Sequence, residues 1–302
     1  ATGMGKVFFA NSGAEANEGA IKLARKYSYD KYGKGRSKII TLWNSFHGRT
    51  VTTLKATGQT RFHDYFFPFT EGFDYAVAGD LDDLKSKIDD STCAVMFELI
   101  QGEGGVLPQD PAFVQAVREL CTEKDLLLIV DEVQTGIGRT GSLFCFQQYG
   151  ILPDVVTMAK GLGGGVPIGA VMAAKNCCDV LTPGTHATTF GGTPTVCAAA
   201  NAVLSIVNDE KFLAEVREKG EYLKNAILSL GSPAIHGVRG KGLMLGIIVD
   251  EGQHSVFANK LIEHGVLVIT AGKNAVRLLP PLTITYEELD EAIAIMKTVF
   301  CD

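Results

Sequence analysis

The sequence lacks any long block of charge of one sign. Its 28 Lys and Arg residues and its 34 Asp and Glu residues are intermixed, and the formal net charge is -6. A basic stripe for nucleic acid and a polybasic face for a membrane are therefore not indicated. No apolar run approaches the ~18 residues of a membrane span. We expect a protein that acts on small molecules and binds neither nucleic acid nor membrane.

Paired cysteines are lacking as well. The seven cysteines are an odd number, form no CxxC pair and mostly lie in apolar runs, where a thiol behaves as a small hydrophobic side chain. This usage excludes a secreted disulfide framework and is typical of the reducing cytoplasm. An initiating methionine is also lacking, because the chain runs from Ala1 almost at once into strand-like residues 7–9. We expect that an upstream segment is missing.

What the sequence has is an alternation of strand-like and helical segments over 302 residues, of which 46% are hydrophobic. Runs such as 126–130 are apolar throughout, as expected of strands that helices cover on both faces. The alternation predicts an α/β fold with a parallel sheet. The expected strands are 7–9, 38–43, 93–98, 126–130, 155–158 and 168–173, and the expected helices are about 15–30 and 111–124.

The pattern changes after about residue 194. Two helical stretches are followed by short strands and a final helix, which predicts a smaller α+β domain. We place the border so that residues 1–208 form the large domain and residues 209–302 the small one. The expected helices are 195–207, 211–230 and 287–300, and the expected strands are 243–249, 266–269 and 276–279.

A lysine and an aspartate each end one of the expected strands. Lys160 follows 155–159 and opens onto a glycine-rich loop, and Asp131 follows 126–130. An amine between apolar walls can attack a carbonyl, while a neighbouring carboxylate can hold a pyridinium nitrogen protonated. The pair therefore suggests pyridoxal phosphate (PLP). The structural alternatives are a surface lysine and an aspartate that caps a turn.

Ligands of open α/β sheets collect at the carboxyl ends of the strands. Ser12, Gly13 and Ala14 connect the first strand to its helix. Their backbone amides could bind a phosphate at the start of the helix, although a plain capped turn is the alternative. In the next such loop, the ring of Phe46 could cover a planar cofactor beside His47, and Arg49 could grip a carboxylate. The alternatives are a core phenylalanine, a loop histidine and a solvated arginine.

Four further polar positions lie in or directly after expected strands. Glu98 and Glu103 flank glycines after a buried strand, with a solvated loop as the alternative. Gln134 follows Asp131 closely enough to reach a ring hydroxyl. Arg277 is a charge inside an apolar strand, so it requires a carboxylate partner from the protein or from a substrate.

Taken together, the motifs resemble the class III PLP-dependent aminotransferases, and most closely the acetylornithine aminotransferases. The resemblance covers essentially the whole chain. It implies a fold-type-I α/β transferase with helices on both faces of a mostly parallel sheet. It also implies a cytoplasmic homodimer with active sites at the interface, which uses PLP and no metal. The motifs are NSGAEANE (residues 11–18), FHGRT (46–50), QGEGG (101–105), DEVQTGIGRTG (131–141), AK (159–160), TTFGG (188–192) and RLLPP (277–281).

The resemblance implies a role for each matching cofactor residue. Lys160 is the Schiff-base lysine and proton shuttle, and Asp131 is the partner of the pyridine nitrogen. Gln134 binds the ring oxygen and Phe46 stacks on the ring. The other cofactor-binding residues implied are Ser12, Gly13, Ala14, His47, Thr188 and Thr189, of which Thr189 reaches across from the partner subunit.

The resemblance also implies the substrate site. Arg49 grips the distal carboxylate of glutamate or the α-carboxylate of the acetylated ornithine, Arg277 grips the α-carboxylate of glutamate, and Glu103 pairs with Arg277 when that grip is not needed. The implied reaction transfers an amino group from N-acetylornithine to 2-oxoglutarate in arginine biosynthesis. Ornithine, succinylornithine, succinyldiaminopimelate and 4-aminobutyrate aminotransferases share these motifs, so the donor remains open.

The sequence also departs from the family pattern. Leu99 replaces the usual proline, Ala187 a glycine and Thr193 an asparagine, and we expect these changes to be tolerated. Family members carry a further segment before the position of Ala1 that contributes to the small domain and the subunit interface. A rival hypothesis is therefore an inactive, truncated homologue that serves as a binding or dimerisation partner.

Overall fold

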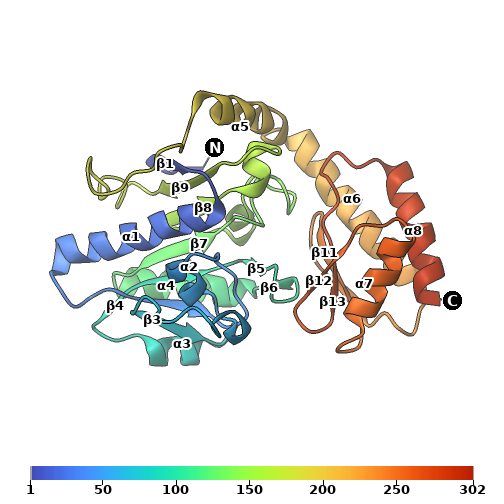
Figure 1. The fold of residues 1–302 in the computed structure, drawn as a ribbon, viewed down its shortest axis with the longest axis horizontal. Coiled ribbons are helices and arrows are strands. Elements are labelled where there is room, and N and C mark those ends of the chain that lie inside the picture. The colour runs from blue at the N-terminus through green and yellow to red at the C-terminus, as the bar shows by residue number, and fades with distance from the viewer. Residues whose placement is uncertain (1, 302) are drawn as a thin grey trace. The chain divides into compact units, whose positions relative to one another are not determined.

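The computed structural model describes residues 2–301 (Figure 1). Ala1, on which the expectation about the start of the chain rests in part, lies outside the described residues. The chain divides into two compact units, which are described separately below. The N-terminal unit contains the chain up to Leu99, Gln109–Ile137 and Phe144–Ile206, and the C-terminal unit contains Ile100–Pro108, Gly138–Leu143 and the chain from Val207 on. The sequence pattern gave no sign that the two short internal segments belong with the C-terminal unit.

The N-terminal unit is built on a mostly parallel sheet, which confirms the predicted fold class. Strand β9 is the exception, since it pairs antiparallel with both β8 and β1. Parallel strands require a crossover connection, usually an α-helix. Between β8 and β9 the chain forms only a short 3-10 helix, Lys160–Gly163. The strands are β1 (Lys6–Ala10), β2 (Lys38–Leu42), β3 (Phe73–Ala76), β4 (Thr92–Phe97), β7 (Leu127–Asp131), β8 (Val155–Met158) and β9 (Gly169–Ala173), in the order β1-β9-β8-β7-β4-β2-β3.

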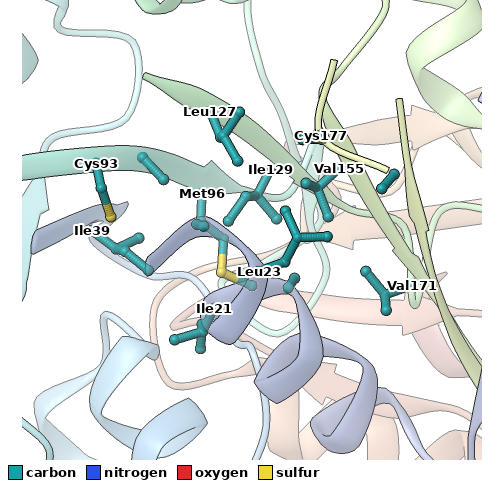
Figure 2. Close-up of a cluster of buried hydrophobic side chains, with 14 of the residues drawn as sticks. Ile21, Leu23, Ile39, Cys93, Met96, Leu127, Ile129, Val155, Val171 and Cys177 are labelled. Carbon is teal, nitrogen blue, oxygen red and sulfur yellow. The ribbon is translucent and has the colours of Figure 1, made fainter. Parts of the chain in front are cut away.

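Helices cover both faces of this sheet. Ile21 of α1 packs with Met96 and Ile129 in a cluster of buried side chains (Figure 2). Successive strand residues point to opposite faces, and the ring of Phe97 contacts that of Phe113 in α4, so α4 covers the other face. Burial of each such side chain stabilises the fold by roughly 1.5–3 kcal/mol. The helices are α1 (Gly13–Tyr32), α2 (Val51–Ala56), α3 (Leu81–Lys87), α4 (Pro111–Glu123) and α5 (Pro194–Val207).

Strand β7 carries the aspartate that the sequence singled out. Leu127 and Ile129 belong to the cluster under α1, and Asp131 is two residues further along the same strand. Because side chains alternate along a strand, Asp131 points to the α1 side of the sheet. A carboxylate thus emerges at the carboxyl end of the strand, on the face that α1 covers.

The C-terminal unit has its own antiparallel sheet and core. Its strands are β10 (Gly237–Lys241), β11 (Met244–Ile248), β12 (Ile269–Ala271) and β13 (Ala275–Leu278), in the order β10-β11-β13-β12, with a separate pair β5 (Ile100–Gln101) and β6 (Leu107–Pro108). Its helices are α6 (Glu210–Ser229), α7 (His254–Glu263) and α8 (Tyr286–Cys301). Leu223, Ile247 and Leu261 are among the buried side chains between this sheet and these helices. The strand expected at 266–269 begins only at Ile269.

Across residues 2–301, we find no helix that combines the length and the apolar character needed to cross a membrane.

Candidate active site

A cavity of about 580 Å³ lies within the N-terminal unit, at the carboxyl ends of the parallel strands. Its walls are the loops that follow β1, β2, β4, β7 and β8, together with the segment that leads into β9. Sites in open α/β sheets form at this edge. The predicted site residues in its lining are Ser12, Gly13, Ala14, Phe46, His47, Arg49, Asp131, Gln134 and Lys160.

The loop after β1 forms one end of the cavity. Ser12 is the N-cap of α1, and its Oγ accepts a hydrogen bond from the amide of Glu15 at 3.2 Å. The first-turn amides of Gly13 and Ala14 have no acceptor inside the helix, so they are oriented to bind an anion. A Cβ on Gly13 would lie 2.7 Å from Cγ1 of Val133, so the loop approaches its neighbour at a distance that only glycine allows.

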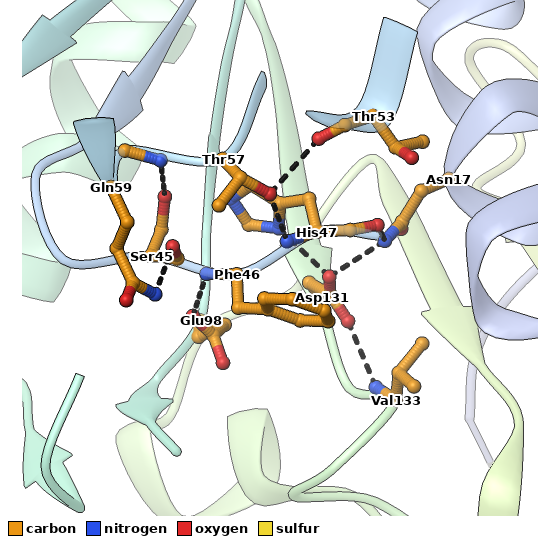
Figure 3. A network of polar contacts seen from close by, with 11 residues as sticks. Asn17, Ser45, Phe46, His47, Thr53, Thr57, Gln59, Glu98, Asp131 and Val133 are labelled. Atoms are coloured by element: carbon orange, nitrogen blue, oxygen red, sulfur yellow. Dashed lines mark hydrogen bonds and ion pairs between the residues drawn. The ribbon is translucent and has the colours of Figure 1, made fainter. Parts of the chain in front are cut away.

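Asp131 lies in the floor of the cavity and accepts three hydrogen bonds (Figure 3). Its Oδ2 accepts from Nδ2 of Asn17 at 2.8 Å and lies 2.8 Å from Nδ1 of His47, and its Oδ1 accepts from the amide of Val133 at 3.0 Å. A carboxylate oxygen only accepts, so Nδ1 of His47 carries the hydrogen. The carboxylate is thereby fixed in one orientation.

The loop that carries Phe46 and His47 is held by side chains from several elements (Figure 3). The amide of Phe46 donates to Oε2 of Glu98 at 2.9 Å, and the amide of His47 donates to Oγ1 of Thr57 at 2.9 Å. Glu98 is buried and lines the cavity. The Phe46 ring meets Phe62 edge-on, with the centroids 5.8 Å apart. These contacts fix the aromatic ring at the cavity wall.

Arg49 lies on the same loop, where it lines the cavity and is exposed to solvent. Its guanidinium carbon lies 5.9 Å from the ring centroid of Phe46 and 5.4 Å from that of Phe62. Such stacking orients the planar guanidinium and leaves its N–H groups able to bind a carboxylate.

Glu132 follows Asp131 but is buried away from solvent. Burial raises its pKa to about 7, an effect to which the charge of Asp131 adds, while hydrogen bonds from Thr135 and the amide of Phe146 oppose it. Its Oε1 accepts from that amide at 2.7 Å. The hydrogen bonds of Glu132 therefore hold the segment that follows β7 in place.

Lys160 lines the cavity, but its surroundings differ from the expectation. The sequence suggested an amine between apolar walls, whereas the residue is exposed in this chain. Its φ is +45°, a left-handed conformation that non-glycine residues seldom adopt. Residues held in this region often mark functional sites. Lys160 begins the short 3-10 helix that follows β8, and its strained backbone lies at the cavity.

The threonines predicted at the cofactor do not line this cavity within the described chain. Thr188 accepts a hydrogen bond at 3.1 Å from Nδ2 of Asn11, which is itself a cavity residue, and Thr189 is exposed. The role of Thr189 toward a partner subunit stays a prediction.

Glu103 and Arg277 both belong to the C-terminal unit. Nη2 of Arg277 lies 2.8 Å from Oε1 of Glu103, and Arg277 is buried in β13. The buried arginine thus has the carboxylate partner that its position requires. Arg139 of the 131–141 motif lies in the same unit, where it donates to the carbonyls of Leu243 and Pro280, and burial lowers its pKa to about 10.

The comparison with known families decides the class of protein. A family model described as "Aminotransferase class-III" matches residues 1–300. The chain belongs to the class-III aminotransferase family. The family predicted from the motifs is confirmed, and with it the transaminase class of activity and PLP as the cofactor of the family.

Individual family members agree with this assignment. The acetylornithine aminotransferase of Haemophilus ducreyi is 51% identical over 303 residues, which span 100% of this chain and 76% of that protein. The acetylornithine aminotransferase of Caldanaerobacter subterraneus is 52% identical over 300 residues, 99% of this chain and 76% of that protein. A solved ornithine aminotransferase from Toxoplasma gondii with partial occupancy of PLP superposes with a TM-score of 0.92 at 36% identity, covering 99% of this chain and 73% of that one.

Three polar residues of the cavity, Asn11, Asn17 and Glu98, were not assigned to the site from the sequence. Glu98 was noted only as one of two carboxylates after a strand, and Asn11 and Asn17 were noted only as members of the 11–18 motif, without a role. The signal for Asn17 was available, because it lies one helical turn before Ala20 and Ile21 on the stripe of α1 that packs on the sheet.

Proposed function

We propose that this chain is a PLP-dependent aminotransferase that transfers the amino group of N-acetylornithine to 2-oxoglutarate and yields N-acetylglutamate 5-semialdehyde and glutamate. The observation that carries the proposal is the cavity in the N-terminal unit. Its lining combines Lys160, the carboxylate of Asp131 and the anion-binding end of α1. Each matches one chemical group of PLP: the aldehyde, the ring nitrogen and the phosphate.

The residues present suit the cofactor. The amides of Gly13 and Ala14 would hold the phosphate at the start of α1, where the helix dipole favours negative charge. Asp131 would hold the ring nitrogen in its protonated form. Phe46 would cover the ring, and Gln134, which also lines the cavity, would bind the ring oxygen. Thr188 would bind the cofactor in the same site. Thr189 would bind the cofactor in the site of a partner subunit.

When bound, PLP supplies an electron sink for the negative charge that develops at the substrate Cα as the C–H bond breaks. Lys160 would hold the cofactor covalently through its Nζ. With the substrate bound, Nζ of Lys160 would take the proton from the substrate Cα as general base and would deliver it to the cofactor as general acid. The carboxylate of Asp131 would stabilise the protonated form of the ring nitrogen.

The substrate carboxylates would be bound by arginines. Arg49, exposed beside the cavity, would bind the distal carboxylate of glutamate or the α-carboxylate of the acetylated ornithine. Arg277 would bind the α-carboxylate of glutamate, and its ion pair with Glu103 would re-form when the other substrate is bound. The exchange neutralises Arg277 in both half-reactions.

We propose a cytoplasmic homodimer. Three consecutive apolar side chains at the surface support an interface with a second copy: Tyr65, which is 85% exposed, Phe66, 55%, and Phe67, 71%. Exposed apolar side chains of this size mark interaction surfaces when they lie together. All seven cysteines, within the described part of the chain, are free, as is usual in a reducing compartment.

Steady-state assays with several amino donors test the reaction. We expect the highest kcat/KM for N-acetylornithine when it is compared at matched concentrations with ornithine, succinylornithine, succinyldiaminopimelate and 4-aminobutyrate. A higher kcat/KM for ornithine would reject the donor while leaving the aminotransferase assignment intact. Failure to bind PLP at all would favour the rival hypothesis of an inactive binding partner.

A further inference from the structure

Asn17 is a buried polar residue on an otherwise apolar helix stripe. It precedes Ala20, Ile21 and Ala24 at helical spacing on the side of α1 that packs on the sheet, and it is 1% exposed. An amide at such a position destabilises the fold unless it is hydrogen-bonded. Asn17 also lines the cavity. Its contacts therefore bear on the site rather than on the helix alone.

The amide of Asn17 joins two parts of the cavity (Figure 3). Nδ2 donates to the carbonyl oxygen of His47 at 2.7 Å and to Oδ2 of Asp131 at 2.8 Å. Both neighbours of Nδ2 accept hydrogen bonds, so the orientation of the amide is fixed, because a flipped amide would place Oδ1 against two oxygens. Asn17 thus ties the loop after β2 to the end of β7.

The acceptor positions of Asp131 are unevenly occupied. A carboxylate offers about four acceptor directions, two on each oxygen. Nδ2 of Asn17 and Nδ1 of His47 both approach Oδ2, whereas Oδ1 accepts from the amide of Val133. Of these hydrogen bonds, two fall on Oδ2 and one on Oδ1. The direction left for a further donor is on Oδ1.

We infer that Asn17 is a positioning residue for the cofactor. With His47 it occupies Oδ2 of Asp131, so that Oδ1 is the oxygen that accepts the hydrogen bond of the pyridinium nitrogen. Asn17 acts through Asp131 and does not itself touch the ring. The inference rests on the proposed function, since it takes PLP as the ligand of the cavity.

Titration of the apoprotein with two ligands tests this role. One ligand is PLP, and the other is its 1-deaza analogue, in which a carbon replaces the ring nitrogen. The wild-type protein should bind PLP more tightly than the analogue. In Asn17→Ala we expect the Kd of PLP to rise roughly 10- to 100-fold, the range for loss of a hydrogen bond to a charged group. The Kd of the analogue should change by less than about twofold, because it makes no bond to Asp131.

Two further variants separate positioning from packing. Asn17→Asp keeps the shape of the side chain but replaces the donor by a second carboxylate, so it should weaken PLP binding at least as much as Asn17→Ala. Ser28→Ala removes another buried polar group of α1, whose Oγ has no partner within residues 2–301, and should leave both Kd values unchanged.

The outcomes distinguish this inference from the proposed function. If the wild type prefers PLP and both Asn17 variants keep that preference, or lose affinity for both ligands equally, the role of Asn17 is wrong. If the wild type binds the two ligands equally well, the pairing of Asp131 with the ring nitrogen is wrong, and the inference about Asn17 falls with it.

Discussion

Nη2 of Arg277 lies 2.8 Å from Oε1 of Glu103, and the arginine side chain is only 4% exposed. The side chain of Glu103 is 29% exposed and is thus the more accessible partner. A buried guanidinium needs a negative partner at all times. We expect a substrate carboxylate that binds Arg277 to replace Glu103 as this partner.

This competition can be measured in Glu103→Gln, which removes the charge and keeps the shape. We expect the Kd of 2-oxoglutarate for the protein loaded with pyridoxamine phosphate to fall about three- to tenfold, because the substrate no longer competes with a carboxylate. Glu263→Gln, at an exposed position of α7, is the control and should not change the Kd. An unchanged Kd in Glu103→Gln would contradict the exchange.

Glu132 should make the stability of the apoprotein depend on pH. Its pKa is about 7 in the folded chain against an ordinary 4.5. The folded state therefore holds the proton more tightly, so the stabilising contribution is complete below about pH 4.5 and is lost as the pH rises through about 7. Glu132→Gln does not titrate. Relative to wild type, we expect it to gain on the order of 2 to 3 kcal/mol between pH 5 and pH 8.

Urea unfolding of the apoprotein at both pH values checks this prediction. Comparison with the surface variant Glu263→Gln removes the general effect of losing one carboxylate. A stability difference between Glu132→Gln and wild type that is the same at pH 5 and pH 8 would show that Glu132 does not titrate in this range.

Gly169 supports the anion-binding loop from β9. A Cβ at this position would lie 2.2 Å from the carbonyl oxygen of Ser12, so Gly169→Ala must displace the loop. We expect the Kd of PLP to rise about tenfold and the stability to fall by roughly 1–3 kcal/mol. In Gly5→Ala the new Cβ would meet Sγ of Cys178 at 2.8 Å, away from the cavity. That variant should lose stability without losing PLP affinity, and an equal loss of affinity in both would refute the role of Gly169.

The cysteines should differ sharply in reactivity. Burial raises the pKa of Cys93, Cys121 and Cys177 to about 12, whereas Cys301 is exposed. Because the thiolate is the reactive form, iodoacetamide at pH 8 should label Cys301 in the native protein and the three buried thiols only after unfolding. Peptide mapping by mass spectrometry measures this order. Early labelling of Cys121 would contradict the packing of α4 on the sheet.

Much of the N-terminal unit was predictable because its strands are continuous apolar runs. Strand β8 has the bounds that the sequence predicts, β7 is shifted by one residue at both ends, and α4 ends one residue earlier than predicted. The antiparallel direction of β9 was harder to predict, because the direction of a strand depends on the connection before it and not on the sequence of the strand itself. Strand β10, Gly237–Lys241, was missed because its sequence GVRGK offers neither an apolar run nor strict alternation.

The candidate site, like the fold, was predictable only in part from the sequence. Lys160 and Asp131 follow strands that the sequence reveals, so their place at one edge of the sheet could be foreseen. The exposure of Lys160 could not, because it depends on a left-handed backbone conformation that no local residue pattern requires. The helical spacing places Asn17 on the buried stripe of α1, but its contact with Asp131, 114 positions further along the chain, depends on the three-dimensional fold.

Covalent trapping at position 160 tests the central claim most directly. The protein is loaded with PLP, reduced with borohydride, digested and mapped by mass spectrometry, with Lys22→Ala as a lysine variant away from the cavity and Lys160→Ala as the key substitution. We predict the reduced adduct on Lys160 alone, retained in Lys22→Ala and lost in Lys160→Ala. An adduct on another lysine, or none in protein that has bound PLP, would contradict the assignment.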